Sequence, residues 1–137
     1  VGLMEATAEH VKKHGGSITG IITHRICDYG KASRLPDELI RVDTLGERKQ
    51  MMLDKADVFI ALPGGFGTLD EIFTVIAAGH LGYHDKKVVF CNTNGFYNLL
   101  INQIELFYRE RFASPHYKNY YQIATNAEEC IRILENF

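Results

Sequence analysis

Apolar and polar positions along this chain follow two alternating patterns, which predict strands and helices in a regular order. Short apolar runs of strand length occupy residues 17–23, 38–42, 57–62, 88–91 and 121–124. Stretches with a helical repeat cover residues 2–14, 45–55, 68–78, 97–111 and 127–135, and Gly15-Gly16 ends the first of them. Because strands that alternate with helices connect by right-handed crossovers, we expect an α/β fold with a parallel sheet covered on both faces.

The length of the chain and one long connection add to this picture. A chain of 137 residues predicts a single domain, residues 1–137, with a core of its own. Residues 24–37 form an irregular loop that holds Gly30 and Pro36. This loop is long for a connection in an α/β fold, which favours a functional or mobile segment.

A glycine-rich turn follows the predicted strand 57–62 and leads into the predicted helix 68–78. Its sequence is Pro63-Gly64-Gly65-Phe66-Gly67-Thr68-Leu69-Asp70-Glu71. Three glycines remove the side chains that would keep an anion from the backbone, and the N–H groups and dipole of the next helix favour a phosphate there. Glu71 is acidic, whereas a site for phosphate alone would favour a basic side chain. This suggests chemistry on a neighbouring sugar or nucleobase. Thr68-x-x-Glu71 also fits a capping box, and on local chemistry the two interpretations stay open.

A second segment at a strand end has similar features. Thr44-x-x-Glu47 fits a capping box at the start of the predicted helix 45–55. Arg48 and Lys49 fall in the first turn, where the helix dipole disfavours cations, so their placement is easier to explain if an anion binds. The alternative is that both side chains extend into solvent. Both segments stand at carboxyl ends of strands, and if those strands are neighbours, Arg48 and Glu71 face one crevice.

Composition and charge exclude several classes of partner. The chain is 46% hydrophobic and 23% charged with a net charge of −2, and its basic residues form no stripe, so we expect no nucleic-acid partner. No apolar run approaches the roughly 20 residues that span a bilayer, so we expect no membrane partner. The cysteines (Cys27, Cys91 and Cys130) lie far apart without CxxC spacing, which is typical of reduced cytoplasmic thiols. His80 and His84 lack a third ligand in register, so we expect no metal.

Several stretches taken together resemble one known family. The segment from Pro63 to Glu71 is similar to the PGGxGTxxE signature of the LOG ("Lonely Guy") family, long labelled possible lysine decarboxylases. Glu47-Arg48-Lys49 resembles the second half of that family's Met-His-x-Arg-Lys motif. Further similar stretches are Gly2-Leu3-Met4, Leu81 to Lys87, and Asn94 to Tyr97, so the resemblance covers essentially the whole chain.

The resemblance implies a fold, an activity and a set of site residues. The fold would be a Rossmann-like, doubly wound parallel sheet in three layers that binds a nucleotide. The activity would be that of a cytokinin riboside 5'-monophosphate phosphoribohydrolase, which cuts the N-glycosidic bond of an adenine ribotide, or of AMP, to free base and ribose 5-phosphate. Arg48 and Glu71 would be catalytic, and a homodimer without a cofactor would be the active unit. The substrate-binding residues would be Lys49, Gly64, Gly65, Phe66, Gly67, Thr68, Leu69 and Asp70.

The chain also departs from the family pattern at three places. Glu5 stands where the family loop usually has glycine, and Leu45-Gly46 replaces Met-His. The family's opening strand–helix–strand segment has no counterpart in this chain, and if the protein itself lacks that segment, part of the nucleotide pocket is missing.

Two alternatives to hydrolysis are a carrier and a decarboxylase. A protein of the same fold could bind a nucleotide or cofactor at the glycine turn without cleaving it. A pure carrier has no reason to keep a carboxylate beside a bound phosphate, so Arg48 and Glu71 favour the hydrolase. A pyridoxal phosphate decarboxylase needs a lysine Schiff base with an acidic partner for the ring nitrogen, and no lysine has an evident setting for that role.

Overall fold

The computed structural model describes residues 2–25 and 33–137, and it divides into two compact units. The first unit is Val1–Lys55 and the second is Ala56–Phe137. Val1 and residues 26–32 lie outside the described residues, and with them Cys27, Gly30 and the middle of the predicted loop 24–37. Each unit has its own parallel sheet.

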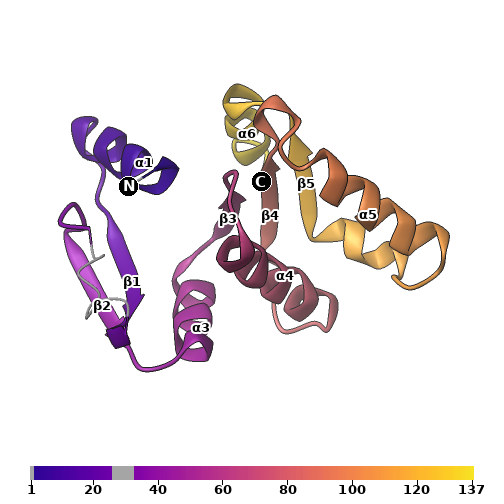
Figure 1. The fold of residues 1–137 in the computed structure, drawn as a ribbon, viewed down its shortest axis with the longest axis horizontal. Helices are drawn as coiled ribbons and strands as arrows, with labels where there is room; N and C mark the ends of the chain where they lie inside the picture. The colour runs from indigo at the N-terminus through magenta and orange to yellow at the C-terminus, as the bar shows by residue number, and fades with distance from the viewer. Residues whose placement is uncertain (1, 26–32) are drawn as a thin grey trace. The chain divides into compact units, whose positions relative to one another are not determined.

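Among the residues that the structure describes in the first unit, two strands pair in parallel, and the helices α1 and α3 accompany them (Figure 1). Its elements are α1 (Leu3–Lys13), β1 (Thr19–Thr23), β2 (Glu38–Val42) and α3 (Leu45–Lys55). β1 and β2 pair in parallel with Ile21 opposite Ile40, and α3 contacts both strands. Gly15 has a φ of 78°, and the Gly16 N–H donates to the Val11 carbonyl over 2.9 Å, so the predicted helix stop at Gly15-Gly16 is confirmed.

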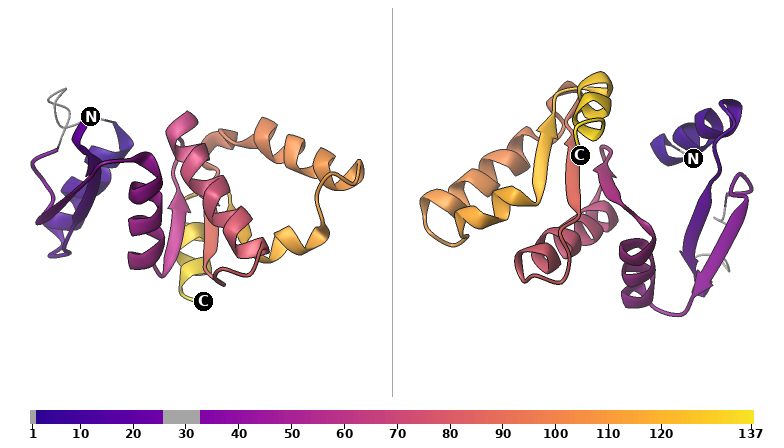
Figure 2. Two further views of the ribbon diagram at one scale, coloured as in Figure 1. Left: turned by 90° about the horizontal axis from the view of Figure 1, so that it is seen from below. Right: turned by 180° about the vertical axis from the view of Figure 1, so that it is seen from behind.

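The second unit contains a three-stranded parallel sheet with β4 in the middle (Figure 1 and Figure 2). In chain order its elements are β3 (Val58–Ala61), α4 (Phe66–His80), β4 (Lys87–Cys91), η1 (Thr93–Gly95), α5 (Asn98–Arg109), η2 (Pro115–Asn119), β5 (Tyr121–Ala124) and α6 (Ala127–Leu134). Ile60 lies opposite Val89, and Val89 lies opposite Gln122. Parallel pairing brings the carboxyl ends of the strands to one edge of the sheet.

The core of the second unit lies on both faces of β4. Val89 and Cys91 pack with Ala124 of β5 and Cys130 of α6 on one face. The ring of Phe90 points to the other face, where it meets the side chains of α5 across a small cavity. Because consecutive β4 residues are buried, the strand is covered on both sides, as expected for a parallel sheet between helical layers.

The predicted α/β fold and its element order are confirmed, with shifted boundaries at some helices. α4 begins two residues earlier than the predicted helix 68–78 and ends two later, and α5 is shorter than the predicted 97–111. The two short 3-10 helices were not predicted. None of the helices among the described residues combines the length and the apolar character that a bilayer span requires.

Candidate functional site

The glycine turn, residues 63–67, leads directly from β3 into the first turn of α4. Gly65 is the N-cap, and the Leu69 N–H makes a helical hydrogen bond to the Gly65 carbonyl over 3.1 Å. No side chain caps this helix start. The interpretation of Thr68 and Glu71 as a capping box is therefore wrong, because the helix begins before Thr68 and places both residues inside it. The N–H groups of the first turn face the region where the turn leaves the sheet.

The three glycines of the turn are glycines for different reasons. A Cβ on Gly64 would lie 2.2 Å from the hydroxyl oxygen of Thr68, so that position must be glycine for the protein to pack. A Cβ on Gly65 or Gly67 would meet no atom of the described residues within 4 Å, apart from its own neighbours in the chain and the helix. Neither of these two has a positive φ, so the backbone conformation does not require glycine there either. No described residue therefore fills the space beside Gly65 and Gly67, which leaves room there for a ligand.

Glu71 lies one turn into α4, on the helical face of Gly67 and Thr68. Residues three and four apart are neighbours on a helix, and side chains tilt toward its N-terminus. The Glu71 side chain is half-buried and starts from the same side of α4 as Gly67 and Thr68. Phe66 stands at the helix start with 95% of its surface exposed. Leu69 is half-buried and Asp70 is exposed.

The second predicted segment forms the capping box that its sequence indicated. The Glu47 N–H donates to the Thr44 hydroxyl over 3.0 Å, and the Glu47 carboxylate accepts the Asp43 N–H over 2.9 Å and the Thr44 N–H over 3.4 Å. Arg48 donates its Nε–H to the Ile21 carbonyl over 2.9 Å. The alternative in which Arg48 extends into solvent is therefore contradicted, because its side chain is half-buried and tied to β1.

The structure places the predicted site residues in both units. Arg48 and Lys49, which is also half-buried, belong to the first unit, and residues 63–71 belong to the second. Within the second unit the open glycine turn and Glu71 are brought together. The proximity of Arg48 to Glu71 stays a prediction.

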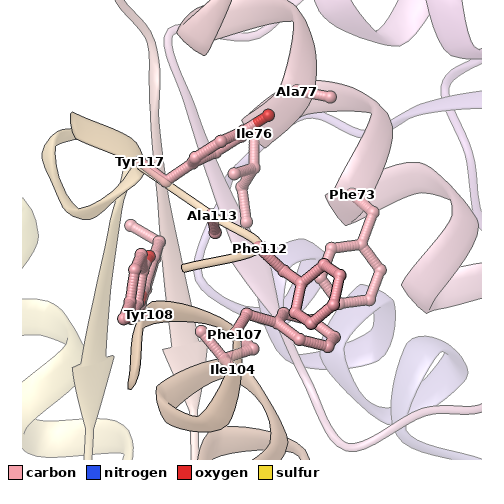
Figure 3. A pocket seen from close by; sticks show the side chains of 10 residues that line it. Phe73, Ile76, Ala77, Ile104, Phe107, Tyr108, Phe112, Ala113 and Tyr117 are labelled. Carbon is pink, nitrogen blue, oxygen red and sulfur yellow. The ribbon is translucent and has the colours of Figure 1, made fainter. Parts of the chain in front are cut away.

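A cavity of about 290 Å³ opens elsewhere in the second unit, between α4, α5, η2 and β5 (Figure 3). Figure 3 shows the rings of Phe73, Phe107 and Phe112 gathered along one side of it. The lining also includes Tyr108 and Tyr121, whose hydroxyls hydrogen-bond to each other over 2.9 Å. Among the described residues that line this cavity, none carries a charged side chain and none belongs to the predicted site. A phosphate has no counter-charge here, so this cavity does not suit the nucleotide.

The histidine that ends α4, His80, and the one that follows it, His84, are both half-buried. The ring of His80 stacks on Tyr117 with centroids 3.8 Å apart, and its Nδ1 is buried without a hydrogen-bond partner among the described residues. His84 Nε2 lies 3.0 Å from the Val75 carbonyl, and His84 Nδ1 accepts the Lys86 N–H over 3.0 Å. In the described part of the chain, no group of three or more His, Cys, Asp or Glu side chains is arranged to hold a metal ion.

Two of the cysteines lie in the core of the second unit. Cys91 and Cys130 are free thiols and are buried together between the sheet and α6. Burial raises the pKa of the Cys130 thiol, with the neighbouring Cys91 adding to the effect. A thiol held protonated is a poor nucleophile, so Cys130 is a packing residue.

Comparison with known proteins points to one family. The family model described as "Possible lysine decarboxylase" matches residues 4–134. The chain is 38% identical over 137 residues to cytokinin riboside 5'-monophosphate phosphoribohydrolase LOG5 of Arabidopsis thaliana, and this match covers all of the chain and 60% of that relative. It is 35% identical to LOG3 of the same plant, of which it covers 64%. It is 33% identical to the probable phosphoribohydrolase LOGL9 of Oryza sativa subsp. japonica, of which it covers 60%.

Proposed function

This chain belongs to the family described as possible lysine decarboxylase, the LOG family, and we propose that it acts as a phosphoribohydrolase. The proposed reaction is hydrolysis of the N-glycosidic bond of an adenine ribotide, either a cytokinin riboside 5'-monophosphate or AMP, to free base and ribose 5-phosphate. The chain spans about 60% of the length of the relatives that carry this activity in their names. The proposal therefore concerns the activity of the whole protein, together with the roles that the residues of this chain have in that activity.

One observation carries the proposal from the structure. Gly65 and Gly67 are required neither by backbone conformation nor by packing against any residue that the structure describes, and they leave open the backbone at the start of α4. A helix N-terminus with exposed N–H groups favours a phosphate, both by hydrogen bonding and through its dipole. A carboxylate one turn away, that of Glu71, has no use in binding that phosphate, and it supports chemistry on the attached sugar.

We assign Glu71 to the charge that develops on the ribose. As the bond to the base breaks, its electrons leave with the base and positive charge builds on the ring. A carboxylate near the ring stabilises that charge and can position or deprotonate the water whose oxygen attaches to the sugar. One electrostatic group of this kind contributes on the order of 3 kcal/mol, or about a hundredfold in rate.

We assign Arg48 to the groups that carry negative charge in the same reaction, which are the phosphate and the leaving base. A guanidinium is a planar fork that matches phosphate oxygens and opposes negative charge on the leaving base. Its Nε–H is anchored on the Ile21 carbonyl, so the terminal nitrogens of the fork are held in a fixed direction. Lys49 would add a second cation for the phosphate. This role requires Arg48 and Glu71 to reach one substrate.

A direct assay separates the hydrolase from a nucleotide carrier of the same fold. Purified protein is incubated with AMP and, separately, with isopentenyladenosine monophosphate, and free base and ribose 5-phosphate are quantified by chromatography. A hydrolase releases the two products in equal amounts. A carrier binds the ribotide, as measured by calorimetry, without releasing free base, and that result would replace the proposal with the carrier.

We also propose that the protein assembles as a homodimer through the helices at 45–55 and 68–78. On the second of these, Phe73 is 36% exposed and lies beside Phe112, which is 86% exposed. Exposed aromatic side chains gathered on one surface favour burial against a partner. Light scattering coupled to gel filtration should give twice the monomer mass at micromolar concentration, and a monomer mass would contradict this assembly.

The proposed compartment is the cytoplasm. Cys91 and Cys130 are buried as free thiols, a state that a reducing compartment maintains. Fractionation of cells that express a tagged full-length protein would test this expectation, which predicts recovery in the cytosolic fraction.

A further inference from the structure

The hydroxyl of Tyr97 reaches the backbone at the start of the glycine turn. It donates a hydrogen bond to the Leu62 carbonyl over 2.5 Å, and the backbone of Gly64 lies close enough to lower the pKa of the hydroxyl. Leu62 and Gly64 flank Pro63, so a single oxygen is hydrogen-bonded to the backbone before the proline and lies near the backbone after it. Tyr97 is only 2% exposed, which means that water does not compete for this hydrogen bond.

Tyr97 is itself held by a part of the fold that does not include the glycine turn. Its backbone N–H donates to the Asn92 side-chain oxygen over 2.7 Å, and the Asn92 N–H donates to the Ala124 carbonyl of β5 over 2.7 Å. Its ring lies edge-on to Phe90 of β4, with centroids 5.3 Å apart. The tyrosine is thus fixed at the carboxyl end of β4, beside the end of β3 where the turn begins.

The glycine turn needs such support from outside. Pro63 has no N–H to donate, and the two glycines that follow have more backbone freedom than any other residue type. A ligand that binds to a mobile turn must first order it, which lowers affinity. A turn that is already held in place presents its N–H groups without that cost.

We propose that Tyr97 is the positioning residue that pre-organises the phosphate-binding turn. This inference rests on the proposed function, because it takes the glycine turn to be the phosphate site. Tyr97 does not touch the substrate in this account; it acts through the backbone of Leu62 and Gly64. The expected consequence is a loss of affinity for phosphate-bearing ligands when the hydroxyl is removed, with a smaller change in the chemical step.

The protonation state of Tyr97 suits this role. Burial raises the pKa of its hydroxyl above the ordinary tyrosine value. The hydroxyl therefore keeps the proton that it donates to Leu62 to a higher pH than an ordinary tyrosine does.

The chain offers a matched control for this residue. Tyr121 also presents its ring edge to Phe90, with centroids 6.0 Å apart, and its hydroxyl hydrogen-bonds to that of Tyr108. Tyr97→Phe and Tyr121→Phe thus remove the same atom from two rings that pack on the same phenylalanine. Only the first change removes a hydrogen bond at the start of the glycine turn.

The first measurement is amide hydrogen exchange in the ligand-free variants. With Tyr97→Phe we expect the amides of residues 64–67 to exchange about tenfold faster than in the wild type, which corresponds to the loss of one net hydrogen bond. Tyr121→Phe should leave these amides unchanged. Unchanged exchange in Tyr97→Phe would overturn the proposal. If Tyr97→Phe does not fold, Asn92→Ala loosens Tyr97 while keeping its hydroxyl, and it should accelerate the same amides to a smaller extent.

The second measurement is the dissociation constant for AMP, with KM and kcat measured in parallel. Tyr97→Phe should raise the AMP dissociation constant, the inhibition constant of inorganic phosphate and KM by about tenfold each, with kcat changed less than threefold. Tyr121→Phe should change none of these values. Equal effects of the two substitutions would assign Tyr97 a merely structural role and overturn the proposal. If the wild type binds AMP but releases no base, the proposed hydrolysis fails while the dissociation constants still decide the role of Tyr97; if it does not bind AMP, both fail.

Discussion

Arg48 donates its Nε–H to the backbone carbonyl of Ile21, so a side chain in the first turn of α3 is tied to the middle of β1. Arginine has further N–H groups beyond Nε, whereas an ammonium is a single point of charge on a flexible stem. The anchor therefore fixes the direction of the guanidinium, and this explains how a cation is kept at a helix start where the dipole disfavours it.

Replacing Arg48 by lysine tests this anchor. Arg48→Lys keeps the charge but cannot hold the Ile21 carbonyl and an anion in one planar fork, so kcat/KM for the ribotide should fall by about ten- to a hundredfold. The free energy of unfolding should fall by about 1 kcal/mol for the lost hydrogen bond. The control is Arg109→Lys, since Arg109 is 74% exposed in a surface pair with Glu110. Full activity in Arg48→Lys would show that charge alone is needed.

The glycines of the turn give a prediction in which stability and binding move in opposite directions. Gly67 lies inside α4 and a Cβ there meets no atom within 4 Å, so Gly67→Ala should raise the free energy of unfolding by up to about 1 kcal/mol. The added methyl group occupies the space assigned to the phosphate, so the AMP dissociation constant should rise. Gly64→Ala should instead destabilise the protein, because its Cβ would clash with Thr68. Calorimetry on both variants checks this. Normal AMP binding by Gly67→Ala would show that the phosphate does not bind at this turn.

The capping box of α3 predicts a local cost at Thr44. Thr44→Ala removes the acceptor for the Glu47 N–H and should lower the free energy of unfolding by about 1 kcal/mol. Thr68→Ala is the matched control, because Thr68 lies within α4 and does not cap it, so its effect should be smaller. Urea unfolding of the two variants gives the comparison, and equal losses would contradict the assignment of the caps.

The raised pKa values of Tyr97, which is buried, and Tyr121, which is half-buried, predict a loss of stability at alkaline pH. Burial is the main cause that raises the pKa of Tyr97 and of Tyr121 above the ordinary value of 10.0. Above pH 10 the unfolded chain releases protons that the folded chain keeps, so the free energy of unfolding is at its full value below pH 10 and falls as the pH rises further. Unfolding measured on both sides of pH 10 should show this fall. It should be shallower in a variant with both Tyr97→Phe and Tyr121→Phe.

Local signals in the sequence were sufficient for the order of elements and for one of the two capping boxes. At Thr44 and Glu47 the signal was correct because the helix starts where the predicted strand has just ended. At Thr68 and Glu71 the same spacing occurs inside a helix, because Gly65 serves as the N-cap and lets α4 begin at Phe66. Glycine is tolerated at an N-cap, so two starting points fitted the sequence equally well.

The contacts that the sequence did not reveal join residues far apart in the chain. The hydroxyl of Tyr97 reaches Leu62, 35 positions away, and His80 stacks on Tyr117. Neither contact leaves a periodic or local trace, since both depend on how β3, β4 and the following turns are brought together. The support of the glycine turn by a tyrosine therefore became visible only in the structure.

The most direct test of the central claim compares the wild-type protein with Glu71→Gln on the same ribotide. Release of free base and ribose 5-phosphate and the dissociation constant for AMP are measured in both. We expect the wild type to release both products, and Glu71→Gln to bind AMP with similar affinity while its turnover falls on the order of a hundredfold. Near-normal release of ribose 5-phosphate by Glu71→Gln, or no release by the wild type, would contradict the account.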